Sequence, residues 1–213
     1  MVDRVNTSGA PRTRRAERAE QTRRSILEAA TALFVERGYP STTIEAVAAG
    51  ADVAVETVYS RFRTKANLLT AILEPAIVGG SEGHDLLRHP EIELIGATTD
   101  QRRQIQLLAR FSRGILERTH TPHTILRTAV GSDPTAAELQ RRDARRRCDV
   151  QRHYIDMLVA NGPLRDGLTS GQAADTYSAL ANPTTYDFLV GERGWTPDQF
   201  QAWLADCLIR ALL

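Results

Sequence analysis

The sequence predicts an all-α fold in two parts, and three observations support this prediction. After residue 18, apolar residues recur at intervals of three and four over most of the chain, which is the period of an amphipathic helix. Capping and stop residues divide these stretches into helices of ordinary length. No run of alternating polar and apolar residues is long enough to indicate a strand.

The composition is that of a folded globular protein. Of the 213 residues, 42% are hydrophobic and 25% are charged, enough for one sizeable domain or two small ones that share a core. No run of 18 apolar residues exists, and the arginine-rich N-terminal segment lacks the apolar centre of a secretory signal. Cys148 and Cys207 lie far apart, which fits two buried thiols better than a disulfide framework. We therefore expect a cytoplasmic protein that does not span a membrane.

Residues 1–18 are expected to form a disordered basic arm, because residues 6–11 are all turn-forming or small. Six arginines and two acidic residues lie between Ala10 and Arg24, although the net charge of the whole chain is only +1. This local charge suits a polyanion such as DNA. A solvated tail without a partner would have the same composition.

Clear stop and start signals separate the helices of the N-terminal third. The first helix carries apolar residues from Ile26 to Phe34 and ends at Gly38. The second begins at Thr42, whose spacing to Glu45 is that of a capping box. After a break at residues 51–52, a third helix is predicted over 54–62, and a fourth starts directly after it.

The rest of the chain is predicted as a loop-rich boundary followed by further helices. The boundary covers residues 79–99, with two glycines at its start and a His-Pro pair within it. The expected helices after it are 104–117, 124–130, 134–161, 172–190 and 197–212. Pro183 should kink the fourth of these helices, because proline removes a backbone donor.

Residues 42–62 have the plan of a helix-turn-helix, in which two short helices meet at a tight turn. Val58 and Phe62, four residues apart, can face the core, so the other side chains of their helix are free to enter a DNA major groove. Hydroxyl and guanidinium groups there can contact phosphates and base edges. The candidate DNA-binding residues are Thr42, Thr43, Val55, Glu56, Thr57, Tyr59, Ser60, Arg61 and, at the start of the next helix, Lys65.

A series of ordered matches to a known domain runs through residues 22–69. The matching groups are Ile26-Leu27-Glu28-Ala29-Ala30, Leu33-Phe34, Arg37-Gly38-Tyr39, Thr42-Thr43-Ile44, Val47-Ala48, Thr57-Val58-Tyr59, Phe62, Lys65 and Leu68-Leu69. On these residues the segment resembles the DNA-binding domain of the TetR family of transcriptional regulators. The resemblance implies a three-helix DNA-binding domain at 19–65 and a helical effector-binding and dimerisation domain at 66–213. It also implies phosphate contacts by Thr43, Thr57, Tyr59 and Lys65, and base-facing positions at Val55, Glu56 and Ser60.

The sequence departs from the family pattern around the turn. Asp52 stands where the family commonly has glycine, and aspartate is one of the few other residues that tolerate a left-handed conformation. Ala54 replaces the usual serine cap, which loses about 1 kcal/mol of capping free energy. Val55 and Glu56 replace the more usual lysine and glycine, and a glutamate can accept a hydrogen bond from cytosine. These changes concern which operator sequence is bound rather than whether DNA is bound.

The closing stretch, residues 179–208, resembles the same family more weakly, as the pair of C-terminal helices that commonly forms a four-helix dimer interface. Apolar and aromatic side chains could supply such an interface, or could equally belong to the core of one chain. The candidate interface residues are Phe188, Leu189, Phe200, Trp203, Leu204 and Leu208. A homodimer is also expected because two recognition helices one DNA turn apart read a palindrome.

An effector pocket is expected among the central helices, where ligand sites in helical bundles commonly lie. Its candidate residues are Phe111, Ile115, His123, Arg127, Tyr154, Met157 and Tyr177, each of which could instead be ordinary core. The arginine run at residues 141–147 is interpreted as a solvated face balanced by nearby acids, with an acidic ligand or nucleic acid as the alternative.

Two enzyme-like patterns carry little weight. Gly79-x-Ser81-x-Gly83 matches a hydrolase nucleophile motif, but that chemistry needs a strand before the serine, and a helix is predicted there. His120 and His123 have no further ligands at metal-binding spacing. We therefore expect no catalytic residues, no metal and no cofactor.

The function predicted from sequence is that of a ligand-controlled repressor of transcription, with double-stranded operator DNA and an unknown small-molecule effector as partners. A helical carrier or enzyme that keeps the helix-turn-helix as scaffold is the first alternative. A nucleic-acid binder without sequence preference, using only the basic arm, is the second.

Overall fold

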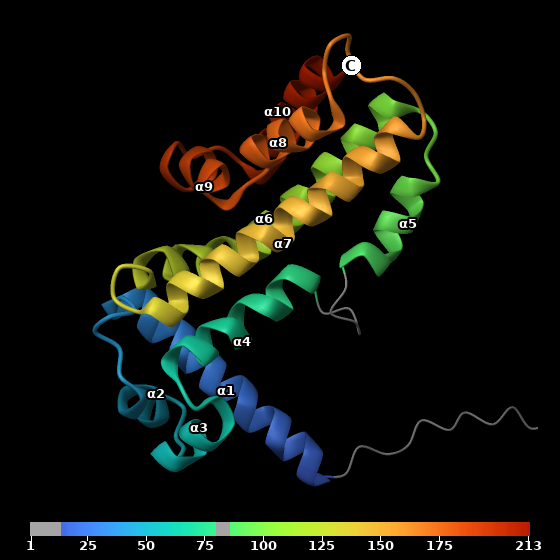
Figure 1. Cartoon of the computed structure of the whole chain (residues 1–213). Helices are drawn as coiled ribbons and strands as arrows, with labels where there is room; N and C mark the ends of the chain where they lie inside the picture. Colours follow the sequence, from blue (N-terminus) through green and yellow to red (C-terminus); the bar gives the residue numbers. More distant parts are fainter. Residues whose placement is uncertain (1–13, 80–85) are drawn as a thin grey trace, which may run out of the picture.

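The computed structural model describes residues 14–79 and 86–213, and every regular element in these ranges is helical (Figure 1). The elements are α1 (Arg14–Arg37), α2 (Ile44–Gly50), α3 (Val55–Phe62), α4 (Lys65–Val78), a 3-10 turn (Leu86–Arg88), α5 (Pro90–Gly96), α6 (Gln101–Ala129), α7 (Pro134–Val159), α8 (Ser170–Leu180), α9 (Pro183–Tyr186), a π-helical segment (Asp187–Glu192) and α10 (Pro197–Leu212). The predicted all-α fold is confirmed. Helices α1–α4 form one end of the molecule, and the long helices α6 and α7 lead from it to α8–α10 (Figure 1).

The N-terminal bundle is built on α1, which buries Ile26, Ala30 and Phe34 at intervals of four residues. Gly38 follows α1 with a φ of 79°, a left-handed conformation that glycine adopts without strain. Helix α2 packs against α1, and α3 packs against α2 and α4; Val47 of α2 and Val58 of α3 are both fully buried. The position of α3 is therefore fixed by the core beneath it.

The prediction of a disordered arm over residues 1–18 was wrong for residues 14–18, which form the first turns of α1. Arginine, alanine and glutamate are good helix formers, and Glu17 lies in the first turn, where the helix dipole favours a negative charge. The rest of the predicted arm, residues 1–13, lies outside the described residues. So does most of the motif from Gly79 to Gly83, since the description stops at residue 79 and resumes at 86.

Two predictions for the middle of the chain were wrong. Helices 104–117 and 124–130 are one continuous helix, α6, which passes through Pro122. Leu116, Thr119 and Pro122 are all buried on one face of α6, and this packing outweighs the hydrogen bond that proline removes. The expected loop at 79–99 contains α5, which begins at Pro90 after His89 accepts a hydrogen bond from the Glu91 backbone N–H (3.2 Å).

The helix expected at 172–190 is instead three elements. Helix α8 ends at Leu180, and the Asn182 side chain then accepts hydrogen bonds from the backbone N–H groups of Thr184 and Thr185, which starts α9. Pro183 occupies the first turn of α9, where its missing N–H costs nothing. The expected kink is therefore a complete break, followed by the π-helical segment. Helix α10 was predicted at its observed bounds.

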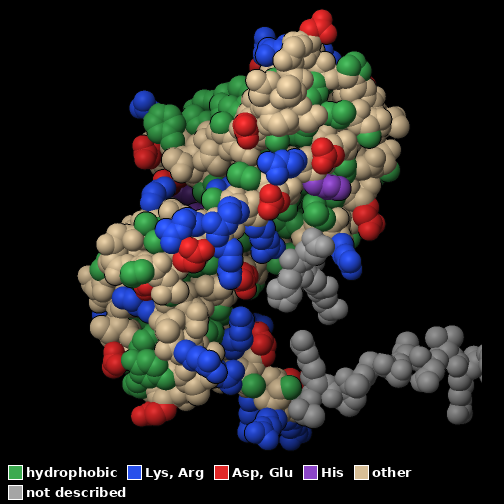
Figure 2. All heavy atoms as spheres, viewed as in Figure 1, with side chains coloured by type: hydrophobic (Ala, Val, Ile, Leu, Met, Phe, Trp, Pro, Cys, Tyr) green, Lys and Arg blue, Asp and Glu red, His purple; other side chains and the backbone are tan. Residues whose placement is uncertain are grey.

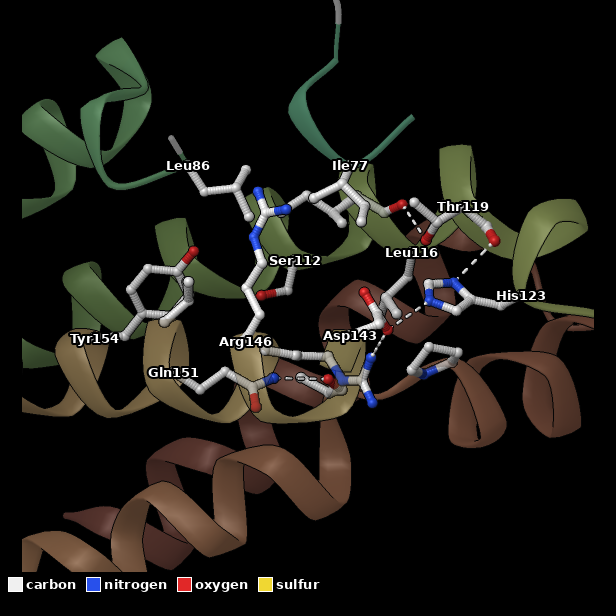
Figure 3. A pocket seen from close by; sticks show the side chains of 15 residues that line it. Ile77, Leu86, Ser112, Leu116, Thr119, His123, Asp143, Arg146, Gln151 and Tyr154 are labelled. Atoms are coloured by element: carbon white, nitrogen blue, oxygen red, sulfur yellow. Dashed lines mark hydrogen bonds and ion pairs between the residues drawn. The ribbon is translucent and has the colours of Figure 1, made fainter. Parts of the chain in front are cut away.

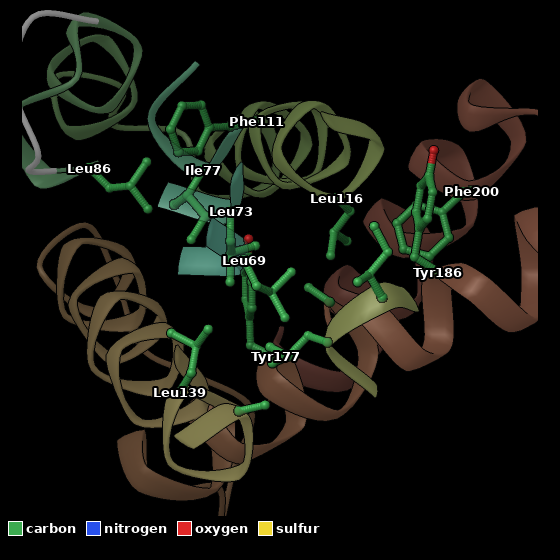
Figure 4. Close-up of a cluster of buried hydrophobic side chains, with 14 of the residues drawn as sticks. Leu69, Leu73, Ile77, Leu86, Phe111, Leu116, Leu139, Tyr177, Tyr186 and Phe200 are labelled. Atoms are coloured by element: carbon green, nitrogen blue, oxygen red, sulfur yellow. The ribbon is translucent and has the colours of Figure 1, made fainter. Parts of the chain in front are cut away.

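One apolar core runs through both ends of the molecule (Figure 4). Leu69, Leu73 and Ile77 of α4 lie in the same cluster as Tyr177 of α8 and Phe200 of α10. Because α4 packs against α1, α6 and α7, it is the element shared by the two parts.

Polar contacts reinforce this junction. The Tyr39 hydroxyl donates to Asp133 at the α6–α7 corner (2.6 Å). On α4, Glu74 pairs with Arg142 of α7 (3.1 Å), and the Ala76 carbonyl accepts from Arg118 of α6 (3.1 Å). The two parts are thus joined at the corner and along α4.

The cysteines were expected to be buried, and this was wrong. Cys148 is exposed on α7, and Cys207 is partly exposed on α10. Both are free thiols.

Candidate DNA-binding surface and effector pocket

The helix-turn-helix predicted at 42–62 is formed by α2, a four-residue turn and α3. The Thr43 side chain caps α2 by accepting a hydrogen bond from the Ala46 backbone N–H (3.1 Å). Asp52 in the turn has a φ of 53°, so the left-handed conformation expected at this position is present. Ala54 precedes α3 and provides no side-chain cap, as its residue type predicted.

One face of α3 is buried and the other is open to solvent. Val58 and Phe62 are buried as predicted, while Glu56, Tyr59, Ser60 and Arg61 are exposed. Val55 and Thr57 are partly buried at the edges. Tyr59, the large residue of this face, is 46% exposed, so its hydroxyl is accessible to a partner.

Hydrogen bonds orient part of this exposed face. The Ser60 hydroxyl donates to the Thr57 carbonyl (3.1 Å). Hydrogen bonds from its own backbone N–H, from Thr43 and from the Tyr59 hydroxyl lower the pKa of Glu45, so its carboxylate is ionised at neutral pH.

The structure corrects the prediction for Thr42, which is 1% exposed and cannot reach DNA. Its hydroxyl lies within hydrogen-bonding distance of the carbonyls of Leu33 (3.1 Å) and Gly38 (2.9 Å). It is Thr43, the next residue, that lies at the helix start with an exposed side chain. Thr42 therefore fastens the α1–α2 loop from inside.

Lys65 also differs from its predicted role. Its ammonium group donates to the backbone carbonyls of Tyr39 (2.7 Å), Pro40 (3.3 Å) and Thr42 (2.9 Å), and it lies over the Tyr39 ring. Burial lowers the pKa of Lys65, and Asp133 partly opposes this effect. Since all three N–H groups of the ammonium have carbonyl partners, Lys65 positions the loop before α2 rather than presenting free donors to a phosphate.

Basic side chains gather beside this surface. Arg14, Arg15 and Arg18 are exposed at the start of α1, and Figure 2 shows Lys and Arg side chains over the same end of the molecule as α3. Positive charge at this end of the molecule would attract a DNA backbone.

A second candidate site is a pocket between α6 and α7, closed by α4 and the α8–α9 junction (Figure 3). It has about 550 Å³ of space, part of which is open to solvent. Its lining is mostly apolar, with polar groups contributed by both long helices. The lining residues are Ile77, Leu86, Ser112, Ile115, Leu116, Thr119, His123, Asp143, Arg146, Arg147, Val150, Gln151, Tyr154, Ala181 and Pro183.

Three of the predicted ligand-binding residues, Ile115, His123 and Tyr154, line this pocket. The structure places the others elsewhere. Phe111 is buried with its ring centroid 6.4 Å from that of Tyr154, and the Tyr177 hydroxyl shares a 2.8 Å hydrogen bond with Ser112.

Met157 and Arg127 also lie away from this lining. Met157 packs against Gly96 of α5. Arg127 is paired with Asp187 on the π-helical segment (2.6 Å) and lines a neighbouring groove that shares His123 and Asp143 with the pocket.

One side of α7 lines the pocket with polar residues that were not among the predicted ligand-binding residues. Asp143, Arg146, Arg147, Val150 and Tyr154 recur at intervals of three and four residues, so they share one side of the helix. The arginine run was interpreted as a solvated face, with an acidic ligand or nucleic acid as the alternative, whereas Arg146 and Arg147 turn towards the pocket. Their spacing to the apolar Val150 and Tyr154 was the signal that could have found them.

The pocket has two chemically different ends. At one end His123 lies 3.1 Å from Asp143, which also pairs with Arg147 (2.7 Å). Burial alone would raise the pKa of Asp143, but the hydrogen bonds and charges of His123 and Arg147 lower it overall. At the other end, burial raises the pKa of Tyr154, and its buried hydroxyl has no hydrogen-bond partner among the described residues.

The prediction for the dimer interface needs a correction. Phe200, Leu204 and Leu208 are completely buried within the single chain, because this face of α10 packs on α6 and α8. Leu189 and Trp203 are partly buried.

Phe188 is the predicted interface residue that is open to solvent, at 44% exposure, and Arg193 lies over its ring. The adjacent Asp187 is fixed to α6 by His120 (2.8 Å) and Arg127 (2.6 Å). The apolar surface left for a partner is therefore narrower than the sequence suggested.

The N-terminal helices match a family model described as bacterial regulatory proteins of the tetR family, over residues 26–72. This range contains α2, the turn and α3. The segment that forms the helix-turn-helix is therefore of the tetR-family type. A comparison with curated proteins finds no match.

Several solved structures match nearly the whole length of this chain. NalD from Pseudomonas aeruginosa, described as the secondary repressor of a multidrug efflux pump, is 26% identical, with 92% of this chain and 98% of NalD covered and a TM-score of 0.70. SmeT, described as the repressor of a Stenotrophomonas maltophilia multidrug efflux pump, is 22% identical over 90% of this chain and 92% of its own, with a TM-score of 0.65. A regulator from Saccharomonospora viridis in complex with choline is 20% identical over 91% of this chain and 98% of its own, with a TM-score of 0.65. The latter two likenesses concern the fold.

Other kinds of site are not evident in the described ranges. Nowhere in residues 14–79 or 86–213 do three His, Cys, Asp or Glu side chains cluster in a way that could hold a metal ion. No helix within these ranges is long and apolar enough to cross a membrane.

Proposed function

We propose that this chain is a TetR-family transcriptional repressor that binds a palindromic operator as a homodimer and is released by a small molecule in the pocket. The observation that carries this proposal is the division of α3 into two faces. The side chains of Val58 and Phe62 are buried, those of Glu56, Tyr59 and Ser60 are exposed, and the helix lies within the matched family domain. Two such helices about one DNA turn apart would read the two halves of a palindrome.

The described relatives support the finer parts of the proposal. NalD and SmeT are described as repressors, and one structure of SmeT contains triclosan. The pocket of this chain, between α6 and α7, has an apolar lining with a few polar groups, as ligand sites generally do. A cytoplasmic location would follow from action on DNA.

Helix α4 offers a physical route between the two sites. Ile77 near its end lines the pocket, and Lys65 at its start donates to the loop that precedes α2. A ligand that displaces Ile77 would therefore act on the element that positions the helix-turn-helix. Release from DNA also requires that the ligand bind the DNA-free arrangement more tightly than the DNA-bound one.

The test is a binding selection on random duplex DNA with the purified full chain, followed by titration of the enriched sequence at two salt concentrations. We expect a palindrome, bound as a dimer and far more tightly than a scrambled duplex. Salt-sensitive binding to every duplex, with no enriched sequence, would support a nucleic-acid binder without sequence preference instead. Absence of DNA binding would favour a helical carrier or an enzyme.

A further inference from the structure

The pocket is elongated along the two antiparallel helices that line it. His123 lies opposite Asp143 at one end, and Ser112 and Tyr154 lie at the other (Figure 3). On each helix the two ends are eleven residues apart, so the pocket extends about 16 Å at the rise of an α-helix. A ligand that meets both ends must therefore be long and narrow.

Two polar contacts hold His123 at this end of the pocket. Its Nδ1 lies 3.0 Å from the Thr119 carbonyl, and its Nε2 lies 3.1 Å from the Asp143 carboxylate. A ring nitrogen that carries a proton can donate a hydrogen bond to either oxygen.

The lining around Asp143 has a net positive charge, because Arg146 and Arg147 both line the pocket beside this one carboxylate. The side chains of His123 and Asp143 are only 12% and 11% exposed. Charges that are this well shielded from water interact more strongly than charges on an open surface. A single negative charge on a ligand would neutralise this end.

The opposite end offers one hydrogen-bond donor. The Tyr154 hydroxyl lines the pocket, is shielded from solvent, and has no partner within the described part of the chain. A buried unpaired hydroxyl is unfavourable, so a ligand acceptor placed there would remove that cost.

The uncharged polar groups of the lining, apart from Tyr154, are already engaged within the chain. Ser112 bonds Tyr177, the Thr119 hydroxyl donates to the Ile115 carbonyl (2.8 Å), and the Gln151 amide donates to the Ala181 carbonyl (2.9 Å). Between its ends the pocket therefore favours an apolar body.

We propose that the effector is an elongated amphipathic carboxylate. Its charged group pairs with His123 and Arg147, its apolar body lies between α6 and α7, and an acceptor at its far end meets Tyr154. The role of this ligand as an effector rests on the proposed function. Its chemical class does not, because ligand binding can be measured without DNA.

The first experiment is calorimetric titration of the purified full chain with three matched probes: decanoate, decanol and decyltrimethylammonium. They share a chain length and differ in the charge of the head group. We expect decanoate to bind at least tenfold more tightly than the other two, because a charge-assisted hydrogen bond is stronger than a neutral one. Equal affinity for all three, or preference for the cation, would overturn the proposal.

Arg147→Gln tests the charged end, with Arg145→Gln as the matched control. Arg145 lies on the same helix but is 64% exposed and paired with Glu138. The affinity for decanoate should fall roughly tenfold or more in the first variant and stay unchanged in the second. An equal effect of both changes would show that the head group does not lie at His123 and Arg147.

Tyr154→Phe tests the far end with a second pair of probes, dodecanoate and ω-hydroxydodecanoate. The wild type should prefer the hydroxy acid, which places an acceptor near Tyr154, and the variant should lose that preference while binding dodecanoate as before. A preference retained in the variant would overturn the assignment of Tyr154.

Operator release is measured separately, with the DNA sequence obtained by selection. If decanoate binds as predicted and the operator stays bound, the proposed ligand class is supported and the proposed release of the operator by this ligand is contradicted. If decyltrimethylammonium binds better than decanoate and releases the operator, ligand-controlled repression stands and the carboxylate is wrong.

Discussion

Tyr154 and Tyr177 are both buried, and removal of their hydroxyl groups should have opposite effects on stability. The Tyr154 hydroxyl has no partner in the described part of the chain, whereas the Tyr177 hydroxyl shares a 2.8 Å hydrogen bond with Ser112. Each change to phenylalanine removes one oxygen atom and leaves the ring in place, so the two variants are matched.

The magnitudes follow from the two hydrogen-bonding states. An unpaired buried polar group costs about 1–3 kcal/mol, so Tyr154→Phe should raise the free energy of unfolding by about 1 kcal/mol at the lower end of that range. Tyr177→Phe removes the hydrogen bond to Ser112, which has a net value of about 1 kcal/mol, and leaves the Ser112 hydroxyl without this partner. It should therefore lower the free energy of unfolding. The two variants should therefore differ by about 2 kcal/mol or more in the free energy of unfolding, with wild type between them.

Thermal unfolding followed by circular dichroism would measure this difference. For a chain of this size, 1 kcal/mol corresponds to a shift of about 2–4 °C in Tm, so the variants should be separated by about 4–8 °C. Protein concentration must be equal in all samples, because the Tm of a dimer depends on it, and no ligand should be added. If Tm falls equally in both variants, the Tyr154 hydroxyl has a hydrogen-bond partner in the protein. The proposal that this hydroxyl is free to donate to a ligand would then be refuted.

Other changes test other parts of the molecule. Tyr59→Phe should weaken DNA binding roughly tenfold on all duplexes, whereas Glu56→Gln should change which sequence a binding selection enriches; the same enriched sequence for both would contradict these roles. Phe200→Ala should lower the free energy of unfolding by about 3–5 kcal/mol because the ring is completely buried, while Trp203→Ala, at a partly exposed position, should be milder in urea titration. Asp143→Asn should cost about 2 kcal/mol at neutral pH by removing charged hydrogen bonds. Because its partners hold the pKa of Asp143 below the usual value, this stabilisation is present above the unfolded pKa near 4 and is lost as pH falls through the folded pKa, so the two Tm curves should converge in acid.

The local signals in the sequence were sufficient for the DNA-binding helices and for α10. Four-residue spacing identified Val58 and Phe62 as buried, and Pro197 marked the start of α10. The adjacent threonines at 42 and 43 show the limit of such signals, because either hydroxyl can cap a helix. Only the packing of the α1–α2 loop decides that Thr42 is inside and Thr43 is the cap.

The pocket and the interface depended on tertiary packing, which the sequence does not record. Apolar residues of α10 have the same composition whether they face their own chain or a partner, and Phe200 turned out to face its own chain. Arg146 and Arg147 are equally charged members of one run with Arg141, and they differ only in the side of α7 on which they lie. Residue type alone therefore could not separate pocket from solvent.

Asp187 receives a hydrogen bond on each carboxylate oxygen, from His120 and from Arg127, two residues seven positions apart on α6. Two attachment points to one helix restrict pivoting of the segment at Asp187–Glu192. A rotation or sliding of α6 would therefore also shift the exposed ring of Phe188. The same helix lines the pocket. Ligand binding that moves α6 would therefore also change the orientation of a partner subunit packed against Phe188.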